Sequence, residues 1–195
     1  GHPDYADFKV DLTGKVAVIT GGANGIGASI SEVFAENGAR VYILDLDQSN
    51  GVDLAEFIRK KRGLAEYYHC NIANHKDVEY TFKLIHEDRG QIDILINNAG
   101  ISHIGNVEDT TPDDMDRLYQ VNIKGAYSCL QSAVKYMKQA GGGSIVNMAS
   151  VASVLGLENR FAYSMSKGAI YTMTFSIAKD YIKDKKVCDF GCGKG

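Results

Sequence analysis

Several features that mark other classes of protein are rare or missing in this sequence. Only two prolines occur in 195 residues. The four cysteines form no CxxC pair and no two histidines form an HxxxH pair, so neither a metal site nor a disulfide framework is expected. No basic stripe with interleaved aromatic residues is present, which argues against nucleic-acid binding. No apolar run is long enough to cross a bilayer.

The composition is that of an ordinary globular domain. Hydrophobic residues make up 45% of the chain and charged residues 23%, which are typical proportions. The formal net charge of −3 gives no general attraction to nucleic acid or to anionic membranes. A chain of this length can form one sizeable core. Because no basic segment followed by an apolar one opens the sequence, we expect a soluble cytoplasmic protein with reduced cysteines.

Short β-branched runs alternate with helical patterns along most of the chain. Strands are predicted over residues 15–20, 40–45, 64–70, 92–97 and 143–150, and helices up to 37 and over 49–62, 75–89, 112–139 and 160–183. This alternation indicates βαβ units and a parallel sheet covered by helices on both faces. The strands are continuously apolar, which fits burial on both sides. The sequence therefore predicts an α/β, doubly wound Rossmann sheet, in one domain over residues 1–186.

A glycine-rich loop, TGGANGIG, follows the first predicted strand and opens a helix. Glycines let the chain turn sharply and bring backbone amides close to a pyrophosphate, and the helix start adds free N–H groups. The spacing GxxxGxG differs from the commonest dinucleotide fingerprint. On its own, the loop is weak evidence, and a Gly-rich turn without a function is the alternative.

Asp45, at the end of the second predicted strand, strengthens the case for a dinucleotide. An acid at this place accepts hydrogen bonds from an adenosine ribose and repels a 2′-phosphate. The loop residues Gly22, Ala23 and Asn24 offer no cation to hold such a phosphate. The pattern favours NAD(H) over NADP(H), with a solvated turn acid as the ordinary alternative for Asp45.

The stretch RFAYSMSKGAIYTMTFSIA contains Lys167 as its single charge after Arg160. Lysine is almost never fully buried unless it is paired. Tyr163 lies four residues earlier, so both side chains share one helix face. An ammonium beside a phenol favours the ionised phenol, which makes a general acid/base usable near neutrality. A packed tyrosine with a lysine reaching to solvent is the structural alternative.

At these residues the sequence resembles the short-chain dehydrogenase/reductase family. The match is collinear from about residue 12 to residue 183. It depends on five motifs: TGGANGIG, NNAG at 97–100, VNIKG with Asn122, GSIVNMAS ending in Ser150, and YSMSK with Tyr163 and Lys167. The resemblance implies an NAD-dependent oxidoreductase that interconverts a secondary alcohol and a ketone by hydride transfer.

The resemblance also implies roles for individual residues. Tyr163 would exchange a proton with the substrate oxygen, and Ser150 would hydrogen-bond that oxygen. Lys167 would hold the nicotinamide ribose, and Asn122 would fix a water that links Lys167 to solvent. The cofactor-binding residues would be Gly21, Asn24, Gly25, Ile26, Gly27, Asp45, Leu46, Asn71, Ile72, Asn98, Ala99, Gly100, Tyr163 and Lys167.

Two positions and one surface need comment. Asn71 stands where the family usually has Asp against the adenine amino group, and its side-chain oxygen can still accept that bond. His103 is expected on a surface loop, with an approach to the substrate as the alternative. The family resemblance further implies a homodimer or homotetramer, built on the helices near 112–139 and 160–183.

The family pattern stops after about residue 186. VCDFGCGKG resembles the first motif of methyltransferases that bind S-adenosylmethionine, without the sequence needed for such a domain. We therefore expect residues 187–195 to form an irregular Gly-rich tail, the sheet to lack its last strands, and the chain to be a poor catalyst. The alternative functions are a non-catalytic dinucleotide-binding module and an oligomeric interaction protein.

Overall fold

One parallel sheet runs through the middle of the protein. The computed structural model describes residues 10–181 and 190–193. The strand order is β3-β2-β1-β4-β5-β6, and every neighbouring pair is parallel. The strands are β1 (Val16–Thr20), β2 (Arg40–Asp45), β3 (Leu64–His69), β4 (Ile94–Asn97), β5 (Ser144–Met148) and β6 (Phe190–Gly193). This is the strand order of a doubly wound dinucleotide-binding sheet, which confirms the predicted fold class.

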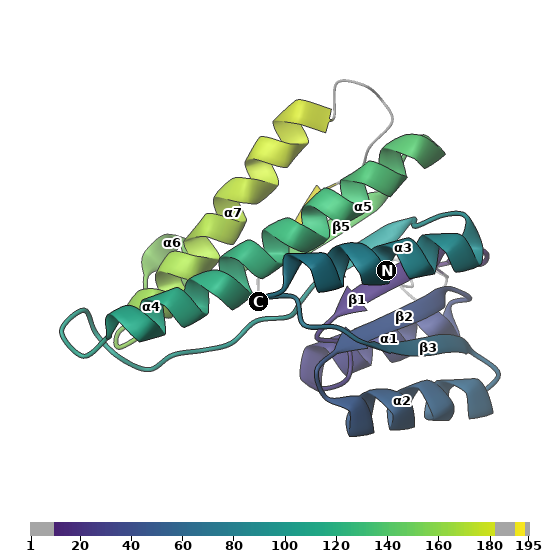
Figure 1. The fold of residues 1–195 in the computed structure, drawn as a ribbon, viewed down its shortest axis with the longest axis horizontal. Helices are drawn as coiled ribbons and strands as arrows, with labels where there is room; N and C mark the ends of the chain where they lie inside the picture. Colours follow the sequence, from purple (N-terminus) through teal and green to yellow (C-terminus); the bar gives the residue numbers. More distant parts are fainter. Residues whose placement is uncertain (1–9, 182–189, 194–195) are drawn as a thin grey trace, which may run out of the picture.

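Helices cover both faces of the sheet (Figure 1). The α-helices are α1 (Gly25–Glu36), α2 (Gln48–Lys60), α3 (His75–Arg89), α4 (Pro112–Leu118), α5 (Ala126–Ala140), α6 (Ala152–Leu155) and α7 (Phe161–Tyr181). One hydrophobic cluster joins the sheet to α3 and α5, with side chains of α7 packed against it, and a second joins the sheet to α1 and α2. Among the helices described, none combines the length and the apolarity needed to span a membrane.

The two clusters follow from the alternation of side chains along each strand. Val16 and Val18 of β1 belong to the cluster beneath α3 and α5, whereas Ala17 and Ile19 belong to the cluster beneath α1 and α2. All residues of β1 are buried. A strand buried on both faces has no polar side, which is why the sequence shows continuous apolar runs rather than alternation.

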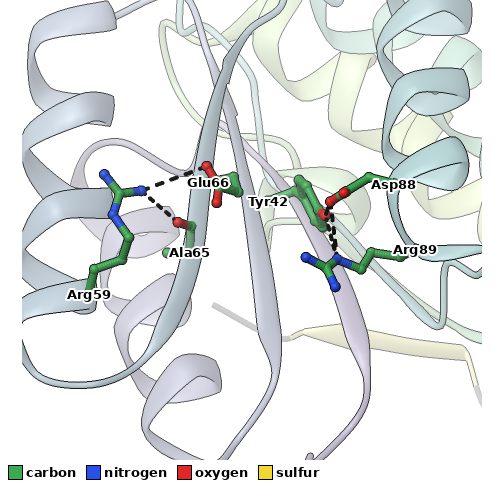
Figure 2. Close-up of polar contacts among 6 residues, drawn as sticks. All are labelled: Tyr42, Arg59, Ala65, Glu66, Asp88 and Arg89. Carbon is green, nitrogen blue, oxygen red and sulfur yellow. Dashed lines mark hydrogen bonds and ion pairs between the residues drawn. The ribbon is translucent and has the colours of Figure 1, made fainter.

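Polar contacts also attach helices to the sheet (Figure 2). The Tyr42 hydroxyl, from β2, donates a hydrogen bond to the Asp88 carboxylate at the end of α3, and Arg89 Nε donates to Tyr42 Oη at 3.3 Å. Burial raises the pKa of Tyr42 to about 12. Elsewhere, Arg59 of α2 donates to the Ala65 carbonyl of β3 at 2.7 Å. Polar contacts as well as apolar ones therefore attach α3 to β2 and α2 to β3.

The helix predicted over 112–139 is interrupted by a wider turn. Between α4 and α5 lies a π-helical segment, η2 (Tyr119–Gly125), which carries Asn122 near its centre. Periodicity does not reveal this insertion because the flanking segments remain helical. Such segments re-aim side chains and often occur at functional sites.

The predicted irregular tail is wrong for four of its residues. Phe190–Gly193 form β6, which pairs in parallel with β5 from Ile145 to Met148. The remaining residues of the predicted tail, 187–189 and 194–195, lie outside the described residues. The open edge of β5 offers unpaired backbone groups to any extended segment, and backbone pairing of this kind leaves little trace in a side-chain pattern.

Candidate active site

A pocket of about 420 Å³ opens where the carboxyl ends of β1 to β4 meet. The strand order changes direction between β1 and β4, the place where open α/β sheets bind ligands. The pocket is lined by Gly21, Asn24, Gly25, Leu44, Asp45, Leu46, Cys70, Asn71, Ile72, Asn98, Ala99, Gly100, Ile101 and Val121. Most of the predicted cofactor-binding residues are therefore brought together. Ile26, Gly27 and the four predicted catalytic residues do not line it.

The glycine-rich loop packs directly against the segment after β4. A Cβ on Gly21, whose φ is +61°, would lie 2.9 Å from Ala99 Cα. A Cβ on Gly27 would overlap the Gly21 carbonyl oxygen and lie 2.6 Å from Asn98 Nδ2. Thr20 Oγ1 accepts hydrogen bonds from the amides of Asn98 and Ala99 at 3.1 and 3.0 Å. Glycine is required at these positions because backbone meets backbone.

Asp45 lies in the pocket wall and orients the turns around it. Its Oδ2 accepts a hydrogen bond from the Ala23 amide at 3.1 Å, and its Oδ1 accepts one from the Asp47 amide at 3.0 Å. The Tyr67 hydroxyl donates to the Asp45 carbonyl at 2.8 Å. The neighbouring Leu46 is largely exposed. Backbone donors thus hold the carboxylate in place in the pocket wall.

Asn71 follows β3 and forms another part of the wall. Its amide donates to Asp77 Oδ2 at 2.7 Å, and its side-chain oxygen accepts from the Ala73 amide at 3.1 Å. A carboxamide oxygen has two acceptor positions, so one remains for a ligand. The predicted contact with an adenine amino group is compatible with this arrangement and stays a prediction.

Asn122 joins the segment after β4 to α7. The side chain is buried, accepting a hydrogen bond from the Ile101 amide and donating one to the Ile101 carbonyl, each at 2.8 Å. Its Nδ2 also donates to Ser166 Oγ at 2.9 Å. These contacts position the protein backbone, whereas the predicted water held by Asn122 stays a prediction.

Lys167 is buried, with 9% of its surface exposed. Its Nζ donates to the Met148 carbonyl at 3.0 Å and lies 5.9 Å from the centre of the Tyr163 ring. Burial lowers the pKa of Lys167. A Cβ added to Gly100 would lie 3.6 Å from Nζ and 3.3 Å from Asn122 Oδ1. The predicted Lys167 and Asn122 therefore meet at Gly100, at the edge of the pocket.

Ser150 and Tyr163 stand beyond this edge. Ser150 Oγ accepts a hydrogen bond from the Ala152 amide at 3.2 Å. The Ser150 amide donates to Ser153 Oγ, which in turn donates to the Lys167 carbonyl at 3.0 Å. The turn after β5 is therefore tied to α7, the helix that carries Tyr163 and Lys167. Within residues 10–181, the Tyr163 hydroxyl makes no hydrogen bond.

His103 is not the surface-loop residue that the sequence predicts. Its side chain is 12% exposed, and its Nε2 lies 3.2 Å from Asp114 Oδ2 in α4. The ring packs on Gly105, where an added Cβ would lie 2.8 Å from Cε1. Gly105 accepts a hydrogen bond from the Phe161 amide at 3.0 Å and donates to Asn159. The loop is thus attached to α4 through His103 and to the start of α7 through Gly105, a long-range arrangement that local polarity does not reveal.

Four residues that line the pocket were missed by sequence reasoning: Leu44, Cys70, Ile101 and Val121. The first three adjoin predicted residues at the ends of strands, so position was the available signal. Burial raises the pKa of Cys70 to about 11, which makes it an inert wall residue. Val121 adjoins the predicted Asn122 and reaches the pocket from the π-helical segment, which helical periodicity does not reveal.

Comparison with known proteins agrees with this geometry. The family model described as short chain dehydrogenase matches residues 15–188. The chain is 41% identical over 173 residues to an uncharacterized oxidoreductase of Thermotoga maritima, covering 89% of this chain and 68% of the relative. The chain spans about two thirds of the length of this relative.

Two solved structures share the arrangement of the elements. NAD+-bound xylitol dehydrogenase has a TM-score of 0.88 and 31% identity, covering 95% of this chain and 70% of the other. A metagenomic short-chain oxidoreductase in complex with NADP has a TM-score of 0.89 and 28% identity, covering 94% and 82%.

Proposed function

Because the chain belongs to the short chain dehydrogenase family, we propose that it interconverts a secondary alcohol and a ketone with NAD(H) as cofactor. The observation that carries this proposal is the position of the buried Lys167. Its Nζ lies 5.9 Å from the Tyr163 ring centre, next to Gly100 at the edge of the 420 Å³ pocket. A cation and a phenol thus lie beside a pocket whose wall includes the glycine-rich loop.

The residues present fit a dinucleotide. Gly21 and Gly27 let the backbone of the loop approach closely, and side chains at these positions would collide with their neighbours. Leu44, Ile72 and Val121 supply an apolar wall for a flat base. When bound, the nicotinamide supplies or accepts the hydride.

Tyr163 is proposed as the group that moves the proton. It would donate to a ketone oxygen or accept from an alcohol, and the charge of Lys167 would favour its ionised form. Ser150 Oγ already accepts a bond from the Ala152 amide, so its O–H is left to donate to the substrate oxygen. Asn122 would keep Ile101 and Ser166 in place around this centre.

The preference for NAD(H) over NADP(H) rests on Asp45. Its carboxylate lies in the pocket wall, where an adenosine 2′-phosphate would meet like charge. Similar folds bind either cofactor: one solved relative contains NAD+ and another contains NADP. The choice therefore depends on local charge rather than on the fold.

A titration of the protein with each reduced cofactor tests this choice. We expect NADH to bind at least about tenfold more tightly than NADPH, a difference of about 1.4 kcal/mol. Asp45→Asn, which keeps the shape of the side chain but removes its charge, should reduce the difference in affinity between NADH and NADPH. Equal affinities in the unmutated protein would contradict the proposed preference. Binding of NADH without oxidation of any secondary alcohol in a panel would favour a non-catalytic dinucleotide-binding module.

We also propose that the protein forms a homodimer or homotetramer through α5 and α7. A groove of about 330 Å³ between these helices is lined by Tyr127, Leu130, Gln131, Val134, Met173, Ser176, Ile177, Asp180 and Tyr181. Phe175, on α7, has 53% of its surface exposed. Light scattering tests the proposal, and Phe175→Glu is expected to shift an oligomer toward monomer.

A further inference from the structure

Two helices of this protein begin with the same residue type but cap their first turns differently. Asn74 is the N-cap residue of α3, and its side chain accepts hydrogen bonds from the amides of Lys76 and Asp77 at 3.1 and 3.3 Å. This is the usual behaviour of asparagine at a helix start. Asn24 is the N-cap residue of α1 and also has an extended backbone, yet its side chain makes no capping hydrogen bond.

The Asn24 side chain is engaged elsewhere. Its Nδ2 donates to Asp47 Oδ2 at 3.0 Å, and its Oδ1 accepts from Asn50 Nδ2 at 2.9 Å. The Asn50 Nδ2 also donates to Asp47 Oδ2 at 2.7 Å. We call these three side chains the Asn24 clamp. It joins the glycine-rich loop to the first turn of α2.

The clamp is anchored by α2 itself. Asp47 is the N-cap residue of that helix, and its side chain accepts a hydrogen bond from the Asn50 amide at 3.1 Å. Hydrogen bonds from Asn50 and Asn24 hold the pKa of Asp47 below its ordinary value. The carboxylate is therefore ionised at neutral pH and remains a strong acceptor for Asn24.

The first turn of α1 is left uncapped as a result. The first backbone bond of the helix runs from the Ala28 amide to the Asn24 carbonyl at 3.1 Å. In the described part of the chain, no group accepts a hydrogen bond from the amides of Gly25, Ile26 and Gly27. Unused amides at a helix start attract anions, through direct hydrogen bonds and through the helix dipole.

We propose that Asp47 and Asn50 are positioning residues that hold Asn24 away from the helix it begins, and so keep the first-turn amides of α1 open for the cofactor pyrophosphate. This inference rests on the proposed function, because it concerns the same pocket. Asn24 and Gly25 line that pocket, whereas Asp47 and Asn50 stand outside its wall. Asp47 and Asn50 act indirectly, because they keep the Asn24 side chain from capping α1.

Asn50→Ala tests the clamp most directly. It removes the donor to Asn24 Oδ1 but leaves the Asp47 carboxylate, so the charge near the pocket is unchanged. The Oδ1 of Asn24, freed from Asn50, should then cap α1 as the Oδ1 of Asn74 caps α3. We expect slower hydrogen exchange at the Ile26 and Gly27 amides, and NADH and inorganic pyrophosphate each to bind about three- to tenfold more weakly.

Asp47→Asn and Asp47→Ala form a matched pair. Asparagine keeps an acceptor for Asn24 and removes a negative charge that repels an anion. This variant should therefore keep fast exchange at Gly27 and bind pyrophosphate no more weakly than the unmutated chain. Alanine removes acceptor and charge together and should behave like Asn50→Ala in the exchange experiment. Unchanged exchange at Ile26 and Gly27 in both Asn50→Ala and Asp47→Ala would overturn the proposal.

The two ligands separate this inference from the proposed function. Weaker binding of pyrophosphate in Asn50→Ala supports the clamp even if the unmutated chain fails to bind NADH, an outcome that would refute the proposed cofactor instead. Equal pyrophosphate affinity in Asn50→Ala and the unmutated chain would overturn the clamp. The clamp would also be overturned if the unmutated chain bound neither NADH nor pyrophosphate.

Discussion

The two ends of the site are built in different ways. At the β1–α1 end, the wall is mostly backbone, and Gly27 is packed so tightly on Gly21 and Asn98 that a single Cβ has no room. At the β5–α7 end, the side chains of Lys167 from α7 and Asn122 from η2 converge near Gly100. Beside them, Val154 and Leu155 are 68% and 80% exposed.

Under the proposed function, this difference assigns cofactor binding and chemistry to separate parts of the fold. The first end has the features of a rigid holder, in which glycines and strand ends set the shape. The second end has the features of a reacting centre, in which a phenol, a hydroxyl and a buried cation are presented by side chains. Substitutions should therefore affect one end without the other.

The largest expected effect is on turnover at the β5–α7 end. Tyr163→Phe removes the proposed proton donor but keeps the ring, so turnover should fall on the order of 10³-fold while NADH affinity changes by no more than a few-fold. Steady-state rates and NADH titration measure the two quantities.

Tyr171→Phe provides the control on the same helix. Tyr171 contacts Phe175 edge to face, at 4.7 Å between ring centres, and lies outside the proposed catalytic set. Its loss of a hydroxyl should leave turnover near the unmutated level. A Tyr163→Phe variant that kept most of its activity would remove Tyr163 from the proposed role.

An intermediate effect is expected from Gly27→Ala at the β1–α1 end. The new Cβ must displace the loop from Asn98, so we expect a loss of about 1–3 kcal/mol in unfolding free energy and at least about tenfold weaker NADH binding. Gly168→Ala, in α7, is the matched control because its Cβ would meet only Ser153 O at 3.5 Å.

Gly168→Ala should leave the free energy of unfolding unchanged or raise it by up to about 1 kcal/mol, because alanine favours the helix. Chemical denaturation compares both variants with the unmutated protein. Similar losses for the two alanines would show that the two ends are packed alike, and the comparison would fail.

The smallest effect is expected at Tyr42, which touches neither end of the site. Tyr42→Phe removes the hydrogen bonds with Asp88 and Arg89, so we expect a loss of about 1 kcal/mol in unfolding free energy with NADH affinity unchanged. Denaturation at neutral pH measures the first quantity.

The Tyr42→Phe variant should also respond differently to alkali. The pKa of Tyr42 is raised to about 12 in the folded protein, above an ordinary value of about 10. Its contribution to stability is therefore complete below about pH 10 and is lost as the pH rises toward 12. The unmutated protein should lose more stability than Tyr42→Phe over this interval. Parallel losses would contradict the burial argument.

Local sequence was sufficient where a function depends on neighbouring residues. The glycine loop, Asp45 at a strand end, and Tyr163 with Lys167 one helical turn apart each lie within a single element or turn. Their joint occurrence in a βαβ pattern predicted the pocket and most of its wall. Leu44 and Cys70 were missed because apolar wall residues carry no motif, although they adjoin predicted positions.

Long-range contacts lay beyond that reasoning. His103 pairs with Asp114 in another element, and β6 forms by backbone pairing with β5. The Asn24 clamp joins the glycine-rich loop to Asp47 and to Asn50 in the first turn of α2. Each depends on the three-dimensional meeting of segments that have ordinary local sequences.

The sequence by itself determined the alternation of strands and helices, the glycine positions and the spacing of Tyr163 and Lys167, because periodicity and backbone freedom are local properties. Only the tertiary structure decided that Lys167 meets Asn122 at Gly100, that η2 turns Asn122 toward Ile101, and that Asn24 leaves α1 uncapped. The physical reason is that a side chain chooses among hydrogen-bond partners only after packing has brought the competitors together.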